Sequence, residues 1–233
     1  MTSSEQTPAG EIWTFVGDTV RGSSHARTEA ENQDAYLFRH LSGAGGEGLV
    51  VAVADGHGSA TYVRSRFGAG FAVLAAVDTL VTACERMNPN DPSSVRAVRA
   101  EVAPAVVQEW YRWVRDHLAA EPLRNEEVEK VRTHRGDAMA ASLGGFPEVV
   151  YGSTVLAAAL SPAFGIFLQL GDGDVRVLTH AGEIWAPFER DVRHVGDETL
   201  SLVSPGASAH VNVRIVPFET GRPRLVLLAT DGV

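Results

Sequence analysis

Short apolar segments of strand-like composition stand on both sides of a long helical region in this 233-residue chain. The segments are four to nine residues long and rich in β-branched residues, which is typical of buried strands. They are Ile12–Val20, Ala35–Phe38, Leu49–Ala54, Thr154–Leu160, Phe164–Leu170, Val175–Leu178, Val211–Val216 and Leu225–Ala229. The order of strands, then helices, then strands predicts an α+β domain with helices laid on the faces of largely antiparallel sheets.

The region between the two groups of strands has helical periodicity. Apolar residues recur at intervals of three and four over Val63–Cys84 and again over Val95–Trp113. A weaker helical stretch covers Glu126–Ala141, and Pro104 is expected to kink or split the second helix. We interpret the apolar stripes as surfaces that pack against a sheet, and we expect Arg64 to lie on a solvated face.

Charge and hydropathy argue against several classes of protein. The formal net charge of −9 argues against nucleic acid as the main partner, because phosphate backbones select basic surfaces. The longest purely apolar runs, Phe71–Val77 and Val155–Leu160, are far shorter than the roughly 20 residues that span a bilayer. The N-terminus shows no basic start and no apolar stretch of a signal peptide. We expect a cytoplasmic monomer that binds neither nucleic acid nor a membrane.

Three common catalytic motifs are absent from the sequence. Its one lysine, Lys130, is followed by Val131, so no phosphate-binding loop ending in Gly-Lys-Ser/Thr can be written. Its one cysteine, Cys84, excludes an internal disulfide and a thiolate metal cage. The sixth residue after Cys84 is Asn90, where a cysteine-dependent phosphatase needs arginine. No Gly-x-Ser-x-Gly elbow is present.

Aspartates recur at the ends of the strand-like segments. Asp55-Gly56, Asp172-Gly173 and Asp231-Gly232 each lie within two residues of the end of an apolar run, and Asp34 directly precedes one. Each Asp-Gly pair alone is typical of a hairpin turn, and Asp172-Gly173 fits such a turn particularly well. Carboxylates gathered at one rim of a core would repel one another, and Mg²⁺ or Mn²⁺ would relieve that repulsion. The set therefore favours a divalent-metal site.

His57 follows Asp55-Gly56 directly. An imidazole with an ordinary pKa of about 6.5 can donate a proton near neutral pH. A single histidine on a loop is commonly a solvated bystander, but the neighbouring Asp55 favours a catalytic role for this one.

Five motifs occur in the order found in a known family. They are Glu31-Asn32-Gln33-Asp34-Ala35, Val53-Ala54-Asp55-Gly56-His57-Gly58, Tyr151-Gly152-Ser153-Thr154, Leu170-Gly171-Asp172 and Ala229-Thr230-Asp231-Gly232-Val233. The chain resembles the metal-dependent protein phosphatase 2C family of Ser/Thr phosphatases from about Val16 to Val233. The segments 22–25 and 196–202 resemble a bacterial branch whose members are often encoded near a kinase, which would be a partner beside the phosphoprotein substrate.

The resemblance implies a four-layer αββα sandwich with two Mn²⁺ or Mg²⁺ ions at one end and a weaker third ion beside them. Asp55 would bridge both ions, the Gly56 carbonyl would bind one, and Asp231 would hold the other. Asp34 would act directly or through water, and Asp172 corresponds to the acid linked to the third ion. We expect residues 1–11 to be a flexible N-terminus and residues 12–233 to be the phosphatase-like domain.

The implied reaction is hydrolysis of phosphoserine or phosphothreonine. Water activated by the two ions attacks phosphorus in line, without a covalent enzyme intermediate. His57 corresponds to the general acid that protonates the departing alkoxide. No Cys or Ser nucleophile is needed.

The sequence departs from the family pattern at several positions. The family places a phosphate-binding arginine where this chain has Glu29, so Arg27, Arg21 or His25 is the candidate for that role. Gln33 stands where the family usually has an acid, and Gly171-Asp172-Gly173-Asp174 replaces Gly-Asp-Ser-Arg. The family continues past its final Asp-Gly to another acidic ligand, so we expect a fold incomplete at its C-terminus or a second metal held more weakly.

Two other functions fit parts of the sequence. The first is a catalytically weak or inactive phosphatase-like module that binds a phosphoprotein or kinase. The second is nucleotide binding, because Gly43–Gly48 matches Gly-x-Gly-x-x-Gly. These glycines precede a strand instead of linking a strand to a helix, so we interpret them as a hairpin loop.

Overall fold

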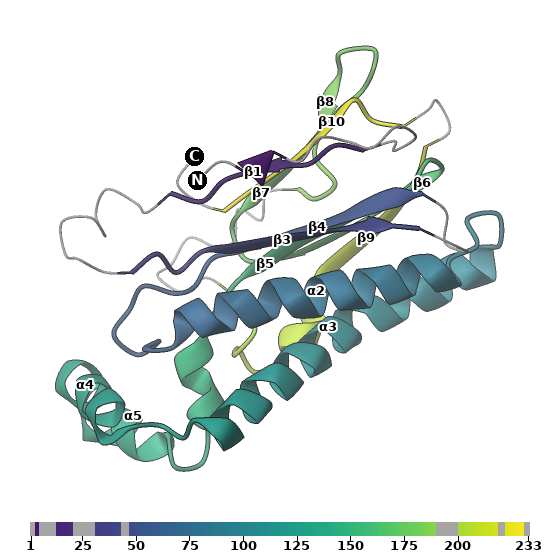
Figure 1. Cartoon of the computed structure of the whole chain (residues 1–233). Coiled ribbons are helices and arrows are strands. Elements are labelled where there is room, and N and C mark those ends of the chain that lie inside the picture. The colour runs from purple at the N-terminus through teal and green to yellow at the C-terminus, as the bar shows by residue number, and fades with distance from the viewer. Residues whose placement is uncertain are drawn as a thin grey trace.

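Two antiparallel sheets lie face to face, and a pair of long helices covers the outer face of the larger sheet (Figure 1). The computed structural model describes residues 3–4, 13–20, 31–42, 47–189, 200–218 and 222–230. The larger sheet has the strand order β3 (Ala35–Leu41), β4 (Gly48–Ala54), β5 (Val155–Leu160), β6 (Phe164–Leu170) and β9 (Asn212–Pro217). The smaller sheet has the order β10 (Leu225–Ala229), β7 (Asp174–Leu178) and β8 (Ile184–Trp185). A short pair, β1 (Ser3–Ser4) and β2 (Val16–Gly17), completes the strands of the described residues.

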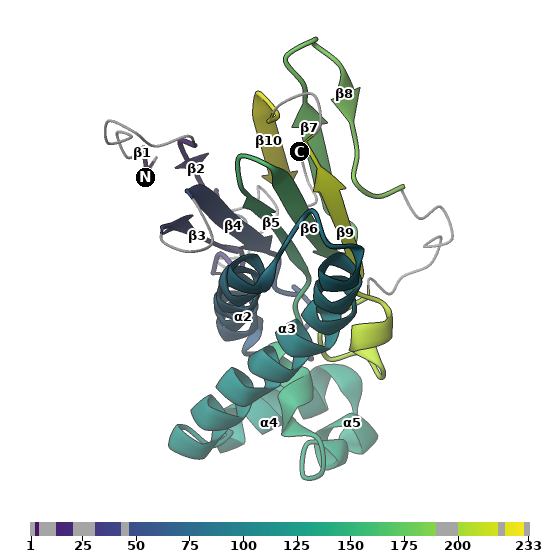
Figure 2. The same ribbon diagram turned by 90° about the vertical axis from the view of Figure 1, so that its right-hand side faces the viewer.

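The helices lie between β4 and β5 in the sequence, and Figure 2 shows them below the larger sheet. They are α2 (Ser65–Arg86), α3 (Pro92–Ala120), α4 (Asn125–Arg135) and α5 (Asp137–Ser142), followed by the 3₁₀ turn η1 (Pro147–Tyr151); a second such turn, η2 (Ala207–Ala209), precedes β9. Helix α3 starts at an N-cap, where the Asp91 carboxylate accepts a hydrogen bond from the Ser93 N–H at 2.8 Å. Pro92 occupies its first turn, where a missing N–H costs nothing.

Helix α3 is continuous through Pro104, so of the kink or split expected there the split does not occur. A proline removes one hydrogen bond within a helix. Here Val102, Val106 and Val107 are buried on either side of Pro104 and hold both turns against the core. Tertiary packing therefore outweighs the local cost of the proline.

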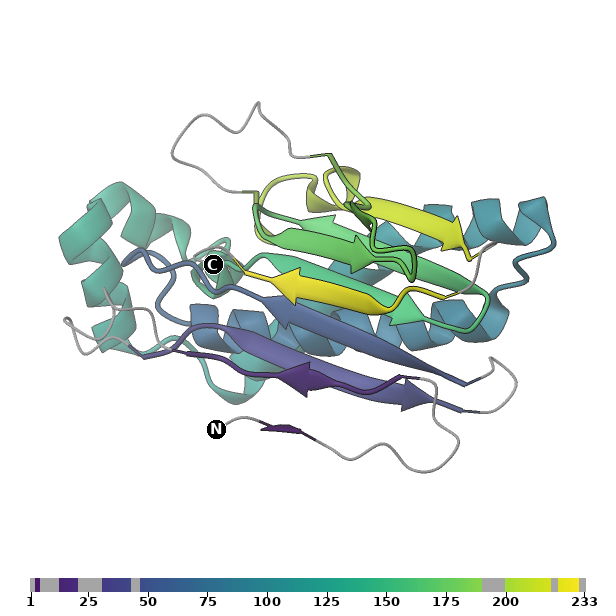
Figure 3. The same cartoon turned by 90° about the horizontal axis from the view of Figure 1, so that it is seen from above.

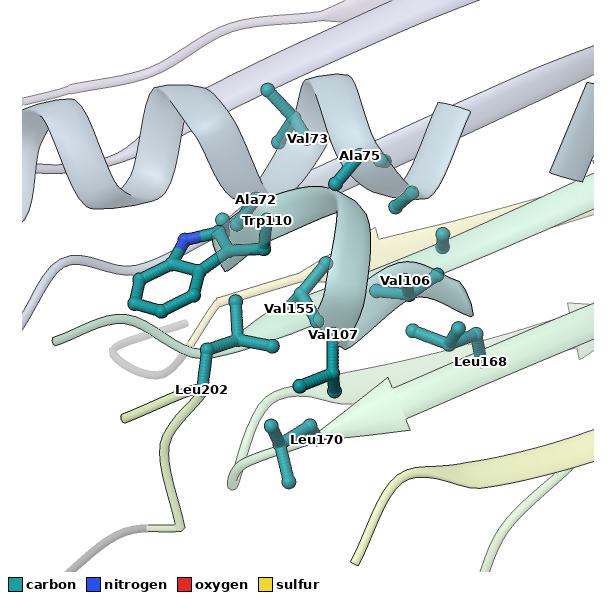
Figure 4. Close-up of a cluster of buried hydrophobic side chains, with 14 of the residues drawn as sticks. Ala72, Val73, Ala75, Val106, Val107, Trp110, Val155, Leu168, Leu170 and Leu202 are labelled. Atoms are coloured by element: carbon teal, nitrogen blue, oxygen red, sulfur yellow. The ribbon is translucent and has the colours of Figure 1, made fainter. Parts of the chain in front are cut away.

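Helix α2 is long and apolar enough to cross a membrane by length and composition alone. In this fold it is a core helix, because its buried residues face the larger sheet and α3. Many of them are alanines, which let the helix approach its neighbours closely. These residues belong to a first apolar cluster, which lies between the helices and the larger sheet. Figure 4 shows Trp110 and Val106 of α3 packed with Ala72 and Ala75 of α2 in this cluster.

A second apolar cluster fills the space between the two sheets. It includes Trp13, Phe15, Leu49, Val51, Leu156, Phe167, Val175 and Val177. Because the central strands of the larger sheet are covered on both faces, β5 is buried at every residue and reads as a continuous apolar run.

The predicted order of strands, helices and strands is confirmed, as is the α+β class with two antiparallel sheets and flanking helices. Within the described ranges, the helices cover one side of the sandwich only. Ile184, Leu225 and Leu227 on the smaller sheet are 69%, 53% and 50% exposed. The described residues thus form three of the four layers of an αββα sandwich.

Two local expectations are resolved by the strand pairing. β3 and β4, which flank the glycine-rich segment in the sequence, pair antiparallel with Leu41 opposite Gly48, as the expected hairpin requires. By contrast, the hairpin expected at Asp172-Gly173 was wrong, because β6 pairs with β5 and β9 whereas β7 pairs with β10 and β8. Gly171, with a φ of 109°, lets the chain leave one sheet and enter the other.

Candidate functional site

Four strand ends of the larger sheet meet at one rim. Ala35, the first residue of β3, is opposite Ala54, the last residue of β4. Asp34 and Asp55 are the next residues along these two strands, so the antiparallel register brings them side by side. The start of β5 and the end of β6 lie at the same rim, because Val155 is opposite Leu170.

Asp172 lies on the connection from this rim to the smaller sheet. A Cβ atom placed on Gly171 would lie 2.6 Å from Cγ2 of Thr154, which directly precedes β5. A Cβ atom placed on Gly173 would lie 2.6 Å from the carbonyl oxygen of Ala229, the last residue of β10. The connection through Asp172 therefore contacts both the start of β5 and the end of β10.

The Asp55 loop is held by the segment that precedes β5. The Asp55 carbonyl oxygen accepts hydrogen bonds from the Thr154 N–H and the Ser153 hydroxyl, each at 2.9 Å. The Asp55 N–H donates to Oγ1 of Thr154 at 3.1 Å, and the His57 N–H donates to the Gly152 carbonyl at 3.1 Å. Gly56 and Ser153 lie opposite each other between these bonds as an isolated antiparallel β-bridge. The Gly56 carbonyl takes no part in the backbone hydrogen bonds of this bridge.

Glycines make this close contact possible. A Cβ atom on Gly56 would lie 2.8 Å from the carbonyl oxygens of both Gln33 and Ser65. A Cβ atom on Gly152 would lie 2.5 Å from the Tyr62 ring and 2.7 Å from Cδ2 of His57. The rings of His57 and Tyr62 lie side by side over Gly152, with centroids 4.7 Å apart. The backbone of Gly152 therefore supports the His57 side chain.

The rim thus gathers five of the residues singled out in the sequence: Asp34, Asp55, Gly56, His57 and Asp172. Arg21, His25, Arg27 and Asp231 lie outside the described residues. No group of three His, Cys, Asp or Glu side chains in the described part of the chain is arranged to hold a metal ion. The donors at the rim are carboxylate and carbonyl oxygens, a donor set that fits Mg²⁺ or Mn²⁺.

Sequence reasoning gave no role to Gly152, Ser153 and Thr154, although their motif contributed to the resemblance. Small hydroxyl residues directly before a strand are suited to hydrogen bonds with backbone groups. That composition is the signal that could have identified them as the support of the Asp55 loop.

Arg64 contradicts the expectation of a solvated face. It lies at the start of α2 and is only 4% exposed. Its guanidinium donates to both carboxylate oxygens of Glu127 at 2.8 Å, to the carbonyls of Glu121 and Pro122, and to the Tyr151 hydroxyl at 2.8 Å. All five N–H groups of the side chain are used, which is what a buried guanidinium requires.

The contacts around Arg64 shift the pKa values of Glu127, Tyr151 and Arg64 itself. The bonds from Arg64 lower the pKa of Glu127 to about 2, and the Glu127 carboxylate in turn raises the pKa of Arg64. Burial raises the pKa of the Tyr151 phenol, so its hydroxyl keeps its proton near neutral pH. That hydroxyl accepts a hydrogen bond from Arg64 and lies 2.7 Å from Nδ1 of His117, within hydrogen-bond distance.

Acid should weaken the fold through the Arg64–Glu127 pair. Because folding lowers the pKa of Glu127 from 4.5 to about 2, its contribution to the free energy of unfolding is complete above about pH 4.5 and is lost as the pH falls toward 2. Glu127→Gln should lower the Tm at neutral pH and reduce the further fall of Tm across that acid range. Thermal melts at several pH values measure both effects.

The matched control for this prediction is Glu101→Gln, which removes the carboxylate of an exposed pair with Arg86. Its Tm should follow that of the unchanged chain at every pH, because exposed ion pairs contribute little. Equal Tm loss in Glu127→Gln and Glu101→Gln would contradict the assignment.

Comparison with known proteins gives one family and a set of similar folds. A family model described as protein phosphatase 2C matches residues 21–233. Solved structures similar to the chain include a variant of a bacterial serine phosphatase (13% identity, TM-score 0.45, covering 82% of this chain and 66% of that one). They also include serine/threonine phosphatase Stp1 from Staphylococcus aureus (12%, 0.48, 86% and 70%). A third is the catalytic domain of serine threonine protein phosphatase PstP with two manganese ions (12%, 0.36, 79% and 72%).

The chain spans about two thirds of the length of the first of these phosphatases, 66%. No curated protein matches the sequence.

Proposed function

We propose, because this chain belongs to the protein phosphatase 2C family, that it hydrolyses phosphoserine and phosphothreonine in proteins with metal-activated water. The observation that carries the proposal is the rim at which Asp34 and Asp55 lie side by side, next to Gly56 and His57. A module that only bound phosphoproteins would have no need of adjacent carboxylates beside an imidazole.

The proposed ligands are oxygen atoms of the rim. Asp55, the Gly56 carbonyl and Asp34 would hold two Mn²⁺ or Mg²⁺ ions together with Asp231, and Asp172 would contribute to a weaker third site. Bound there, the ions would supply a water of lowered pKa and would screen the phosphoryl oxygens.

His57 has the role of general acid in this proposal. Its ring contacts the Tyr62 ring and lies against the backbone of Gly152, and these contacts would help to orient it toward a leaving group. Arg21, Arg27 or His25 would hold the phosphate before attack. The kinase partner, the monomeric state and the cytoplasmic location stay predictions from the sequence.

The test is hydrolysis of a phosphothreonine peptide and of para-nitrophenyl phosphate with Mn²⁺, with Mg²⁺ and with EDTA. We expect release of phosphate that requires the divalent ion and is faster from the phosphothreonine peptide than from its phosphotyrosine counterpart. Calorimetry should show uptake of Mn²⁺ by the same preparation. Phosphopeptide binding without turnover would instead establish the inactive module, and metal-independent release would contradict the mechanism.

A further inference from the structure

Arg64 stands where three parts of the chain meet. It ends the loop that starts with Asp55, and its backbone N–H donates to the Val150 carbonyl at 2.9 Å. Its side chain reaches Glu127 on α4 and the carbonyls of Glu121 and Pro122 that connect α3 to α4. Figures 1 and 3 show α4 and α5 at the end of the sheets where β4 ends and α2 begins.

Tyr151 connects this junction to the rim. The residue is fully buried, and its hydroxyl is fixed between the Arg64 guanidinium and Nδ1 of His117. Its backbone leads directly to Gly152, whose carbonyl accepts the His57 N–H and whose Cα faces the His57 ring. Tyr151 is therefore adjacent in the chain to the peptide that contacts His57.

We propose that Arg64 is a positioning residue for His57, acting through the hydroxyl of Tyr151 and anchored by Glu127. The proposal deepens the proposed function, since it rests on His57 being the general acid. It also makes α4 part of the active-site support, because the carboxylate that anchors Arg64 belongs to that helix.

A merely structural role for Arg64 predicts a different pattern. The buried pair would then contribute to stability alone, and any variant that folds would leave His57 and the chemical step unchanged. A positioning role predicts that His57 moves when only the Tyr151 hydroxyl is removed. Misplacement of a catalytic group lowers kcat while leaving KM nearly unchanged when substrate binding is intact.

The first variant is Tyr151→Phe, which keeps the ring in its buried slot and leaves Arg64 its other acceptors. The matched control is Tyr111→Phe on α3, where the ring packs against Trp110 and beneath Arg115. We expect Tyr151→Phe to lower kcat for para-nitrophenyl phosphate roughly tenfold with little change in KM, and Tyr111→Phe to change neither. Glu127→Gln should act in the same direction as Tyr151→Phe and is the second variant if Tyr151→Phe does not fold.

The second measurement does not need turnover. NMR of the metal-free chain reports the His57 ring protons, whose shifts depend on the adjacent Tyr62 ring, and the exchange rate of the His57 amide that donates to Gly152. We expect Tyr151→Phe and Glu127→Gln to change the ring shifts and to speed amide exchange, and the control to change neither. Unchanged His57 signals in both folded variants would overturn the proposal. If the unchanged chain proves inactive, the proposed function fails while the NMR result still decides the role of Arg64.

Discussion

Asp55→Asn is expected to lower the Mn²⁺-dependent kcat on the order of a thousandfold, the scale on which a main electrostatic group of an active site acts. The substitution removes one negative charge and keeps the shape of the side chain. The loop should stay in place, because Thr154 and Ser153 hold it through the backbone of Asp55. The loss would therefore report the missing carboxylate and not a displaced loop.

The response of stability to metal should change as well. Added Mn²⁺ should raise the Tm of the unchanged chain more than that of Asp55→Asn, because only binding to the folded state stabilises it.

The control is Asp78→Asn on α2, which makes the same chemical change in an exposed ion pair with Arg39 of β3. It should leave both kcat and the Mn²⁺-induced rise in Tm unchanged. Full activity in Asp55→Asn, or an equal response of Tm to Mn²⁺, would remove Asp55 from the proposed site.

Gly68→Ala is expected to have the largest effect on stability. A Cβ atom on Gly68 would lie 1.8 Å from the carbonyl oxygen of Tyr151, and neither the Cβ atom nor this backbone carbonyl can rotate away. The Gly68 carbonyl also accepts a hydrogen bond from Nε1 of the buried Trp110 at 3.0 Å, which ties α3 to the same point. We expect a loss of about 3 kcal/mol in the free energy of unfolding, at the upper end of typical overpacking.

The same helix provides the control. Gly70 lies two residues further along α2, and a Cβ atom there would meet nothing within 4 Å. Gly70→Ala should stabilise the chain by up to about 1 kcal/mol, because alanine is the better helix former. Thermal or urea unfolding of the two variants measures the contrast, and similar stabilities would contradict the packing of α2 on Tyr151.

Much of the fold could be predicted because its signals are local. The apolar periodicity identified α2, α3 and most strands of both sheets. Where the sequence predicts a strand over Ile12–Val20, the structure has only the two-residue strand β2. Trp13 and Phe15 nevertheless pack into the core between the sheets, which accounts for the apolar pattern of this segment.

The failures come from partners that are distant in the sequence. An Asp-Gly pair has the same local signal whether the chain turns back in one sheet or crosses to another, so Asp172-Gly173 was assigned to the wrong turn. The acceptors of Arg64 lie 57 to 87 residues away, and no local pattern shows that they exist. The aspartates at the rim were predictable as a set because each follows or precedes an apolar run.

The hydrogen bond from the Asp55 N–H to Thr154 joins residues 99 positions apart, which has a consequence for synthesis. At 5–20 residues per second, β4 leaves the ribosome roughly 5 to 20 s before its neighbour β5. A lone β3–β4 hairpin is marginally stable, and α2, which contacts both strands in the fold, is synthesised before β5 and is available to cover their apolar face during that interval. The open edge of β4 gives chaperones several seconds in which to bind the nascent chain.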